Sequence, residues 1–336
     1  MKPVVLVDPH PRSKDMIFTS ESWAELTEYS TPVAWFEGGR MPERMVEDHL
    51  AEAEIVIGQT PLDATRLARA DRLKAVINVK GNWEPGLDYH ACQARGIYVL
   101  SIAPCMAPAV AEWCLGAAID LGRGLRLADR SFHEGRERYG IAGNRDARSL
   151  YGTQVGMVGF GNLGRALRPL LVPFGCHVQV YDPWLSTGYL AGFDCEAVGL
   201  ERLLRSADVI FILAGVTTEN THLLTEGLLR RIKPDTSVIL ASRAEIVDFD
   251  ALVRLAAENR FRLAVDVFPQ EPVPAEAPVR KLANATLSAH RAGGIPASYR
   301  RIATWMLDDI RQILAGHPPL CLQRAEPSQA AVMRSR

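Results

Sequence analysis

The stretch that decides the fold is Val155-Gly156-Met157-Val158-Gly159-Phe160-Gly161-Asn162-Leu163-Gly164, followed later by Val178-Gln179-Val180-Tyr181-Asp182. The apolar residues that open each stretch are typical of strands buried in a parallel sheet. The glycines between them have the spacing G-x-G-x-x-G, and Asp182 follows Gly164 by 18 residues. This order predicts a strand, a glycine turn, a helix and a second strand that ends in an acid.

Each glycine of the turn has its own expected use. Gly159 permits the tight turn, Gly161 lets the backbone approach a pyrophosphate, and Gly164 lets the helix pack closely on the strand. The helix N-terminus, with Asn162 and Leu163, would face the phosphates. We therefore interpret residues 159–164 as a dinucleotide-binding turn; a purely structural glycine turn is the alternative.

Asp182 bears on which dinucleotide would bind. A carboxylate at the end of the second strand can accept both hydroxyls of the adenosine ribose, whereas the 2′-phosphate of NADP would meet its negative charge. This favours NAD(H) over NADP(H). The alternative is that Asp182 only opens the turn Asp182-Pro183-Trp184, because Asp-Pro commonly starts turns.

Composition and charge exclude several other classes. The 336 residues include 38 Lys and Arg against 39 Asp and Glu, a formal net charge of −1, so we expect neither a nucleic-acid nor a membrane partner. Arginines between 123 and 148 alternate with acids, which favours a solvated face or a subunit contact. The N-terminal apolar run is too short for a signal peptide, and no apolar run approaches transmembrane length. We therefore expect a cytoplasmic protein.

The six cysteines have no C-x-x-C pairing and no histidines at metal-ligand spacing. We expect them to be reduced and structural, with no metal site.

Strand and helix patterns alternate in two successive series, which predicts the α/β class with two doubly wound domains. The expected strands of the first series are Val4–Val7, Glu54–Gly58, Leu73–Val79 and Ile97–Ile102. Those of the second start at Val155 and continue with His177–Tyr181, Asp208–Leu213, Ser237–Ala241, Arg262–Phe268 and Ala285–Ser288.

Two long helices are expected to join the series. One begins with Pro108 at its first position, and the other carries the apolar stripe Ile302, Met306, Ile310 and Ile313 before Gly316. The polar tail from Leu322 to Arg336 is expected to be disordered.

Three side chains with catalytic potential each follow an expected strand of the second series: Arg243, Glu271 and His290. Ligands of doubly wound sheets bind beyond the carboxyl ends of the strands, so one pocket can hold all three. Arg243 would hold a carboxylate and polarise a carbonyl. His290 would exchange a proton with the carbonyl oxygen, and Glu271 would orient its imidazole and favour the charged form.

These residues lie in a series of motifs that is specific in type and order. Between Glu54 and Gly316 the chain resembles the D-isomer specific 2-hydroxyacid dehydrogenase family. The resemblance rests on Gly159–Gly164 with Asp182, Ile232-Lys233-Pro234 leading to Ser242-Arg243, Val247-Asp248, Asp266-Val267-Phe268 with Glu271-Pro272, and His290 with its following glycines.

The resemblance implies that Arg243, Glu271 and His290 are the catalytic trio and that Asp266 contacts the nicotinamide carboxamide, with Ala241 also in the cofactor site. It implies a Rossmann cofactor domain, residues 106–292, inserted into a flavodoxin-like substrate domain, residues 1–105 plus 293–336. It also implies a homodimer formed through the cofactor domain.

The family's substrate loop would lie around Val79-Lys80-Gly81-Asn82-Trp83. Backbone N–H groups beside Gly81 would cradle the substrate carboxylate, and Lys80 would add a positive charge or be merely solvated. The sequence departs from the family pattern at Ala244, at Arg291 after His290, and at Trp83-Glu84-Pro85-Gly86. Arg291 would be a second substrate-binding cation or an outward-facing salt bridge.

We therefore expect an NAD(H)-dependent oxidoreductase that transfers a hydride between nicotinamide and a small 2-oxo or D-2-hydroxy acid, similar to glyoxylate or hydroxypyruvate reductases. One alternative is a phosphite-type oxyanion dehydrogenase, which would depend on Lys80. Another is an NADH-sensing interaction protein similar to the C-terminal binding co-repressors. The identity of the acid and the physiological direction are left open.

Overall fold

The computed structural model describes residues 1–81, 83 and 86–332. The chain divides into two compact units: unit 1 is Met1–Met106 together with the chain from Gly294 onward, and unit 2 is Ala107–Gly293. Each boundary differs by one residue from the expected one. The chain therefore leaves unit 1, builds unit 2 and returns to unit 1.

Unit 2 is built on a parallel sheet with strand order β12-β11-β10-β9-β6-β7-β8. The order reverses between β6 and β9, which is the switch point of a Rossmann sheet. Its strands are β6 (Gln154–Val158), β7 (His177–Tyr181), β8 (Glu196–Ala197), β9 (Val209–Ile212), β10 (Ser237–Leu240), β11 (Arg262–Val265) and β12 (Ala285–Leu287). The sequence did not predict β8, because two residues are too few to show a pattern.

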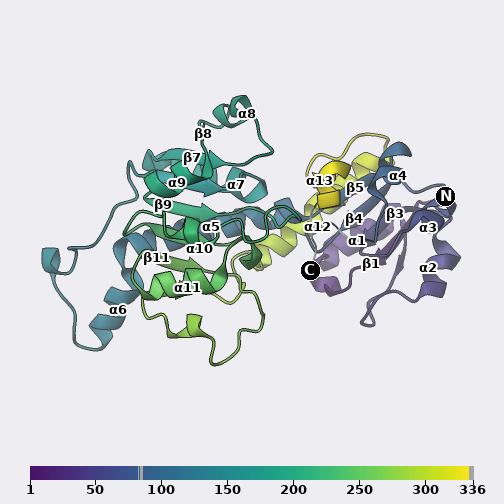
Figure 1. Cartoon of the computed structure of the whole chain (residues 1–336). Helices are drawn as coiled ribbons and strands as arrows, with labels where there is room; N and C mark the ends of the chain where they lie inside the picture. Colours follow the sequence, from purple (N-terminus) through teal and green to yellow (C-terminus); the bar gives the residue numbers. More distant parts are fainter. Residues whose placement is uncertain (82, 84–85, 333–336) are drawn as a thin grey trace. The chain divides into compact units, whose positions relative to one another are not determined.

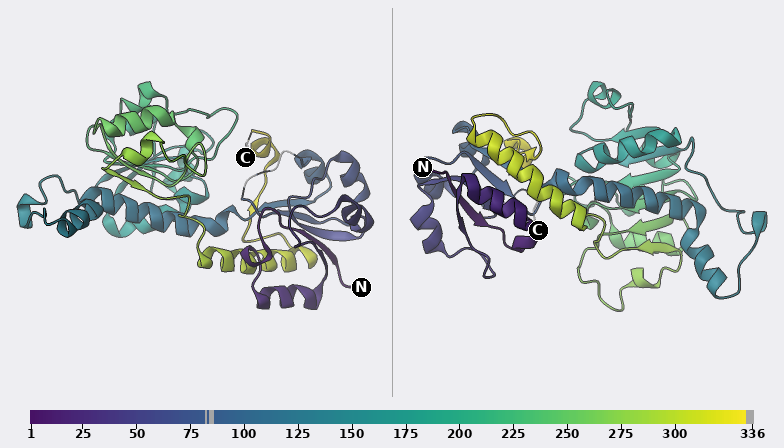
Figure 2. Two further views of the ribbon diagram at one scale, coloured as in Figure 1. Left: turned by 90° about the horizontal axis from the view of Figure 1, so that it is seen from below. Right: turned by 180° about the vertical axis from the view of Figure 1, so that it is seen from behind.

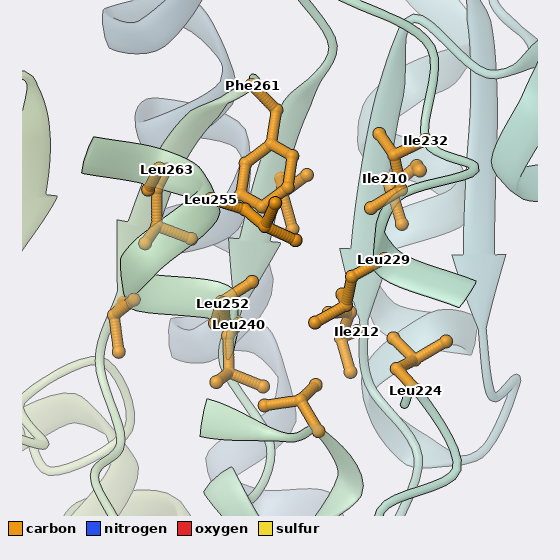
Figure 3. Close-up of a cluster of buried hydrophobic side chains, with 14 of the residues drawn as sticks. Ile210, Ile212, Leu224, Leu229, Ile232, Leu240, Leu252, Leu255, Phe261 and Leu263 are labelled. Carbon is orange, nitrogen blue, oxygen red and sulfur yellow. The ribbon is translucent and has the colours of Figure 1, made fainter. Parts of the chain in front are cut away.

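Helices cover both faces of this sheet (Figures 1 and 2). One face packs against α9, α10 and α11, and the other against α5 and α7. On the first face, Leu252 and Leu255 of α11 meet Ile210, Ile212 and Leu240 of the sheet in a fully buried cluster (Figure 3). The helices are α5 (Ala103–Arg123), α6 (Leu125–His133), α7 (Asn162–Leu171), α8 (Thr187–Ala191), α9 (Leu200–Ser206), α10 (Glu226–Leu229) and α11 (Phe249–Ala257).

Helix α5 corrects two expectations. It begins at Ala103, whose N–H is accepted by Ser101 Oγ at 3.2 Å, so Pro108 lies inside the helix and removes one backbone hydrogen bond there. By length and composition alone α5 is also apolar enough to cross a membrane, although half of that window is buried inside the protein. Its apolar face, with Cys114, Ala118 and Leu121, belongs to the core of unit 2.

Unit 1 has a sheet of order β13-β5-β4-β3-β1-β2, in which β13 is antiparallel to β5. Helices α1 and α12 pack on one face, and α3, α4 and α13 on the other. Its strands are β1 (Val4–Asp8), β2 (Thr31–Ala34), β3 (Ala53–Gly58), β4 (Ala75–Asn78), β5 (Tyr98–Ser101) and β13 (Gln323–Arg324). Its helices are α1 (Ser20–Tyr29), α2 (Glu43–His49), α3 (Ala64–Arg69), α4 (Tyr89–Ala94), α12 (Pro296–Leu314) and α13 (Pro327–Val332).

The predicted α/β class with two doubly wound sheets is confirmed. The stripe of α12, from Ile302 to Ile313, is buried against the sheet of unit 1 as expected. Strand β2 was not predicted, because it contains Pro32 and its residues are only partly buried.

The expectation of a disordered tail is wrong for residues 322–332, which include β13 and α13; residues 333–336 lie outside the described part. Asp309 of α12 explains the order. Its buried carboxylate accepts the N–H groups of Leu320 at 2.7 Å, Cys321 at 3.0 Å and Leu322 at 2.8 Å. These bonds turn the chain back toward β5, where β13 pairs with it.

We expect Asp309→Asn to release this C-terminal segment. The amide NH₂ would face backbone N–H donors, and a buried donor left without an acceptor costs about 1–3 kcal/mol. Limited proteolysis should cleave residues 315–332 faster than in the wild type. The control is Asp308→Asn, whose side chain is 45% exposed; equal cleavage of the two variants would contradict the assignment.

Candidate active site

The glycine turn between β6 and α7 has the geometry that its sequence predicted. Gly159 has φ +92°, and a Cβ there would lie 2.6 Å from the backbone of Ala214. A Cβ on Gly164 would lie 3.0 Å from the ring of Phe160. A side chain at position 159 therefore requires the backbone to shift, and one at position 164 requires at least the ring of Phe160 to move.

Gly161 differs from its two neighbours in the motif, because a Cβ there would meet no atom within 4 Å. It is also the N-cap of α7 and has no side chain to cap the helix. The first-turn N–H groups of this ten-residue helix thus have no capping side chain and open space beside Gly161, which fits a bound pyrophosphate.

Asp182, at the end of β7, makes two hydrogen bonds to the backbone. Its Oδ2 accepts the N–H of Phe160 at 2.8 Å, and its Oδ1 accepts the N–H of Trp184 at 3.0 Å. The second bond is the Asx turn that the sequence left open as an alternative. A carboxylate has about four lone-pair sites, so both oxygens of this half-buried side chain can still accept ribose hydroxyls.

Arg243 follows β10, and hydrogen bonds to nearby backbone carbonyls position this segment. Ser242 is buried and donates its Oγ–H to the carbonyl of Ile212 at 3.1 Å, while Arg243 donates to the carbonyl of Ser242 at 2.7 Å. Burial lowers the pKa of Arg243 from its usual value, and the charges of Glu245 and Glu271 oppose that shift. Ala244, where the family has glycine, is buried at the start of a 3-10 turn.

Glu271 and His290 come together although they follow different strands. His290 Nδ1 and Glu271 Oε2 lie 2.7 Å apart. The other oxygen of Glu271 accepts the N–H of Phe268 at 2.9 Å, which fixes the carboxylate. Both side chains remain partly exposed, at 49% for His290 and 36% for Glu271.

Asp266, at the end of β11, fixes the segment that carries His290. Its carbonyl accepts the N–H of His290 at 2.7 Å, and its carboxylate accepts those of Arg291 at 2.9 Å and Ala292 at 3.1 Å. His290 thereby adopts φ +52°, which non-glycine residues rarely take. Asp266 is 1% exposed, and its expected contact with the carboxamide stays a prediction.

The substrate loop of unit 1 differs from expectation. The N–H groups of Lys80 and Gly81 are accepted by Asn78 Oδ1, at 2.9 and 3.1 Å. Gln59 adds to this, because its amide oxygen accepts from Val79 at 2.9 Å and Lys80 at 3.1 Å. These N–H groups are therefore not available to cradle an anion, and Asn82, Glu84 and Pro85 lie outside the described residues.

The sequence did not predict that the side chains of Asp266, Asn78 and Gln59 position the backbone of the segments that carry the candidate site residues. A polar residue at the end of a buried strand was the available signal, since such a side chain needs a nearby backbone partner. Arg291 is exposed, and among the described residues the structure contains no salt bridge for it. The outward-facing salt bridge considered for Arg291 is therefore not found.

The sequence model described as "D-isomer specific 2-hydroxyacid dehydrogenase, NAD binding domain" matches residues 115–292. The chain belongs to this family. The match lies in unit 2, and it supports a nicotinamide cofactor for this unit.

Relatives cover both units. The crystal structure of a phosphoglycerate oxidoreductase from Rhizobium etli is 37% identical, covers 97% of this chain and 99% of its own, and gives a TM-score of 0.88. A D-3-phosphoglycerate dehydrogenase from Mycobacterium tuberculosis is 29% identical over 286 residues, which are 84% of this chain and 53% of that protein. A glyoxylate reductase from Korarchaeum cryptofilum is 25% identical over 293 residues, 85% of this chain and 87% of that protein. The chain thus spans about half the length of the curated phosphoglycerate dehydrogenases that it matches.

We expect Gly161→Val to weaken NADH binding by roughly tenfold or more, equal to about 1.4 kcal/mol, because its side chain fills the open side of the turn. Fluorescence titration with NADH measures this. The control is Gly159→Val, whose added atoms meet the Ala214 backbone, so it should lower the unfolding temperature more than Gly161→Val does. Wild-type NADH affinity in Gly161→Val would show that the cofactor does not pass over this glycine.

Proposed function

We propose that this protein is an NAD(H)-dependent oxidoreductase that interconverts a small 2-oxo acid and its D-2-hydroxy acid. One observation carries the proposal: the 2.7 Å contact between His290 Nδ1 and Glu271 Oε2. This pair lies at the strand edge that also carries Arg243. Family membership and the glycine turn support the nicotinamide cofactor.

In this mechanism His290 is the proton donor and acceptor. Glu271 accepts the Nδ1–H, so Nε2 is the nitrogen left to exchange a proton with the substrate oxygen. During reduction His290 gives its Nε2 proton to the carbonyl oxygen, and the carboxylate of Glu271 stabilises the imidazolium before that transfer. When bound at unit 2, a nicotinamide would supply the hydride for the carbonyl carbon in reduction and would accept the hydride in oxidation.

Arg243 is the electrostatic part of the mechanism. Its planar guanidinium can hold the substrate carboxylate with two parallel hydrogen bonds and polarise the adjacent carbonyl. The hydrogen bond to the Ser242 carbonyl orients the side chain before substrate binds. Because Arg243 is largely desolvated, its charge acts in a medium of low dielectric, where it stabilises a developing alkoxide more strongly than in water.

The preference for NAD(H) over NADP(H) is part of the proposal. Asp182 offers lone pairs to both ribose hydroxyls, and each charge-assisted hydrogen bond contributes about 1.5–3 kcal/mol. A 2′-phosphate would remove those bonds and add repulsion between like charges.

On the substrate side, the side chain of Lys80 is proposed to face the acid, and Gly81 is proposed to shape the loop beside it. Lys80 brings a positive charge to the loop, and Asn78 holds the backbone of both residues. Relatives named glyoxylate reductase, which match along most of their length, support a small 2-oxo acid.

The decisive experiment follows NADH absorbance with purified protein and glyoxylate, hydroxypyruvate, pyruvate, 2-oxoglutarate and phenylpyruvate, repeated with NADPH. We expect His290→Ala to lower kcat by about 10²–10⁴-fold, the usual contribution of a positioned acid or base. The control is His222→Ala, since His222 is also an exposed histidine with positive φ in unit 2. Equal turnover by wild type and His290→Ala would refute the mechanism. Tight NADH binding without turnover of any acid would favour the oxyanion or sensor alternatives.

We also propose that the protein is a homodimer formed through an arm of unit 2. The arm consists of α6 and the segment to residue 149, and it extends away from the sheet (Figure 1). No residue of α6 is buried, and the arm exposes apolar side chains, among them Phe132 at 61% and Ile141 at 88%. Arg126 anchors its start, through its own N–H to Asp120 at 2.9 Å and its guanidinium to the Ala283 carbonyl at 3.2 Å. An anchored arm with exposed apolar groups is suited to pack against a second copy.

We expect the double variant Phe132→Asp with Ile141→Asp to be monomeric. Charges at these positions would have to be desolvated in the dimer. Light scattering after size exclusion should give the wild type near twice 37.0 kDa and the variant near 37.0 kDa. Leu320→Asp is the control, because Leu320 is 73% exposed and belongs to unit 1. A dimeric double variant would place the interface elsewhere.

A further inference from the structure

The strand that leads to His290, β12, is short and lies at the edge of the unit 2 sheet. It consists of the three residues Ala285–Leu287 and pairs with β11. An edge strand has backbone hydrogen bonds to the sheet on one side and a row of unpaired groups on the other. The position of His290 therefore depends on what else holds this strand.

A side chain of helix α5 supplies a second hold. Asp120 Oδ2 accepts the hydroxyl of Thr286, the middle residue of β12, at 2.6 Å. This distance is typical of a charge-assisted O–H···O bond, which is roughly twice as strong as a bond between neutral groups. Both side chains are partly buried, so β12 is fixed from the helix as well as from β11.

The other oxygen of the same carboxylate caps the arm. Asp120 Oδ1 accepts the N–H of Arg126, in the first turn of α6, at 2.9 Å. The N-cap of α6 is Gly124, which has φ +62° and no side chain to offer an acceptor. Asp120 therefore supplies the missing cap from the preceding helix. One carboxylate thus holds both the start of the arm and the strand that leads to His290.

The neighbouring strand is also joined to the arm. Arg262, the first residue of β11, donates to the carbonyl of Leu121, near the end of α5, at 2.8 Å. It also donates to the carbonyl of Asp146, in the last part of the arm. Glu271 follows β11 and His290 follows β12, so both members of the proton-transfer pair come from strands that are bonded to the base of the arm.

We propose that Asp120 is a positioning residue for His290 and couples this histidine to the arm. While the arm is held, by the second copy that it is proposed to contact, the Asp120 carboxylate keeps β12 where it places the imidazole against Glu271. A small displacement of β12 is sufficient to matter, because a misplacement of about 1 Å can lower a rate about 100-fold. Asp120 acts through Thr286 and not on the substrate. This inference rests on the proposed function and adds a mode of control to it.

The first test removes the bond to β12 and leaves the arm capped. Thr286→Val has nearly the same shape but no hydroxyl, so we expect kcat for reduction of a 2-oxo acid to fall by about 10- to 100-fold with the KM for NADH unchanged. Thr153→Val is the matched control, because Thr153 is also partly buried in unit 2 and donates its hydroxyl to the Leu150 carbonyl, before β6, at 2.9 Å. Equal kcat values for Thr286→Val and the wild type would overturn the proposal.

A spectroscopic measurement follows the histidine without turnover. In ¹⁵N spectra of the ring nitrogens at alkaline pH, the contact with Glu271 should hold neutral His290 as the Nδ1–H tautomer. The signal is assigned by its absence in His290→Ala. We expect Thr286→Val to give a mixture of both tautomers, whereas a merely structural threonine would affect the unfolding temperature alone. An unchanged tautomer in Thr286→Val would rule out the positioning role.

Two substitutions test Asp120 itself. Asp120→Ala removes both acceptors, so it should reproduce the mixed tautomer and also speed limited proteolysis of the arm. Asp120→Asn should restore both properties, since its amide oxygen can accept the Arg126 N–H and its NH₂ can donate to the Thr286 hydroxyl, which accepts as well as donates. The wild-type tautomer in Asp120→Ala, or equal behaviour of the two variants, would contradict the coupling.

The double variant Phe132→Asp with Ile141→Asp tests the arm. We expect its monomer to show the mixed tautomer, and a monomer with the wild-type tautomer would show that the arm does not act on His290. The spectra also separate this inference from the proposed function. If no 2-oxo acid is reduced, the proposed function fails, and the tautomers of the Thr286 and Asp120 variants still decide whether Asp120 positions His290.

Discussion

Parallel strand pairing is the constraint on which the candidate active site depends. In a parallel sheet every strand ends at the same edge, so the segments after β6, β10, β11 and β12 emerge together although they are far apart in sequence. The glycine turn, Arg243, Glu271 and His290 each follow one of these strands. The chemistry thus comes from side chains that are not neighbours along the chain, and the helices between the strands serve to return the chain to the other edge.

Within that edge, hydrogen bonds from side chains to the backbone give the precision that sheet pairing alone does not supply. Asp266 and Glu271 belong to the segment after β11, and each holds a different part of the site. Asp266 binds the backbone around His290, and Glu271 binds both its own loop at Phe268 and the imidazole. Because both carboxylates also bind backbone N–H groups, the position of the imidazole is set by two strand ends. A histidine with φ +52° needs such support, since that conformation is unfavourable for a residue with a Cβ.

The elements that were predicted correctly from the sequence have either a periodic apolar pattern or several glycines at a defined spacing. The glycine spacing, the long apolar strands and the stripe of α12 each contain several residues that agree with one another, so their interpretation held. Elements with few residues, such as β8 and β13, or with contrary residues, such as β2 with Pro32, were missed because tertiary pairing and not local pattern stabilises them. The start of α5 and the ordered C-terminal segment depend on single polar atoms, Ser101 Oγ and the Asp309 carboxylate. No pattern in one sequence shows which backbone N–H such an atom will meet.

The same consideration explains why the two strand edges have opposite chemistry. At each edge the turns use some polar atoms of the strand-end side chains, and the remaining polar atoms determine which kind of group the edge could bind. In unit 2 the residues at these turns include carboxylates, so after Asp182 and Glu271 have bound backbone N–H groups they still offer oxygen lone pairs, which suit ribose hydroxyls and an imidazole N–H. In unit 1 the residue at the β4 turn is an amide, whose oxygen is used by Lys80 and Gly81, so the group left over is a donor. The atom type that a strand-end side chain has left over after its turn is formed therefore changes what the edge can bind.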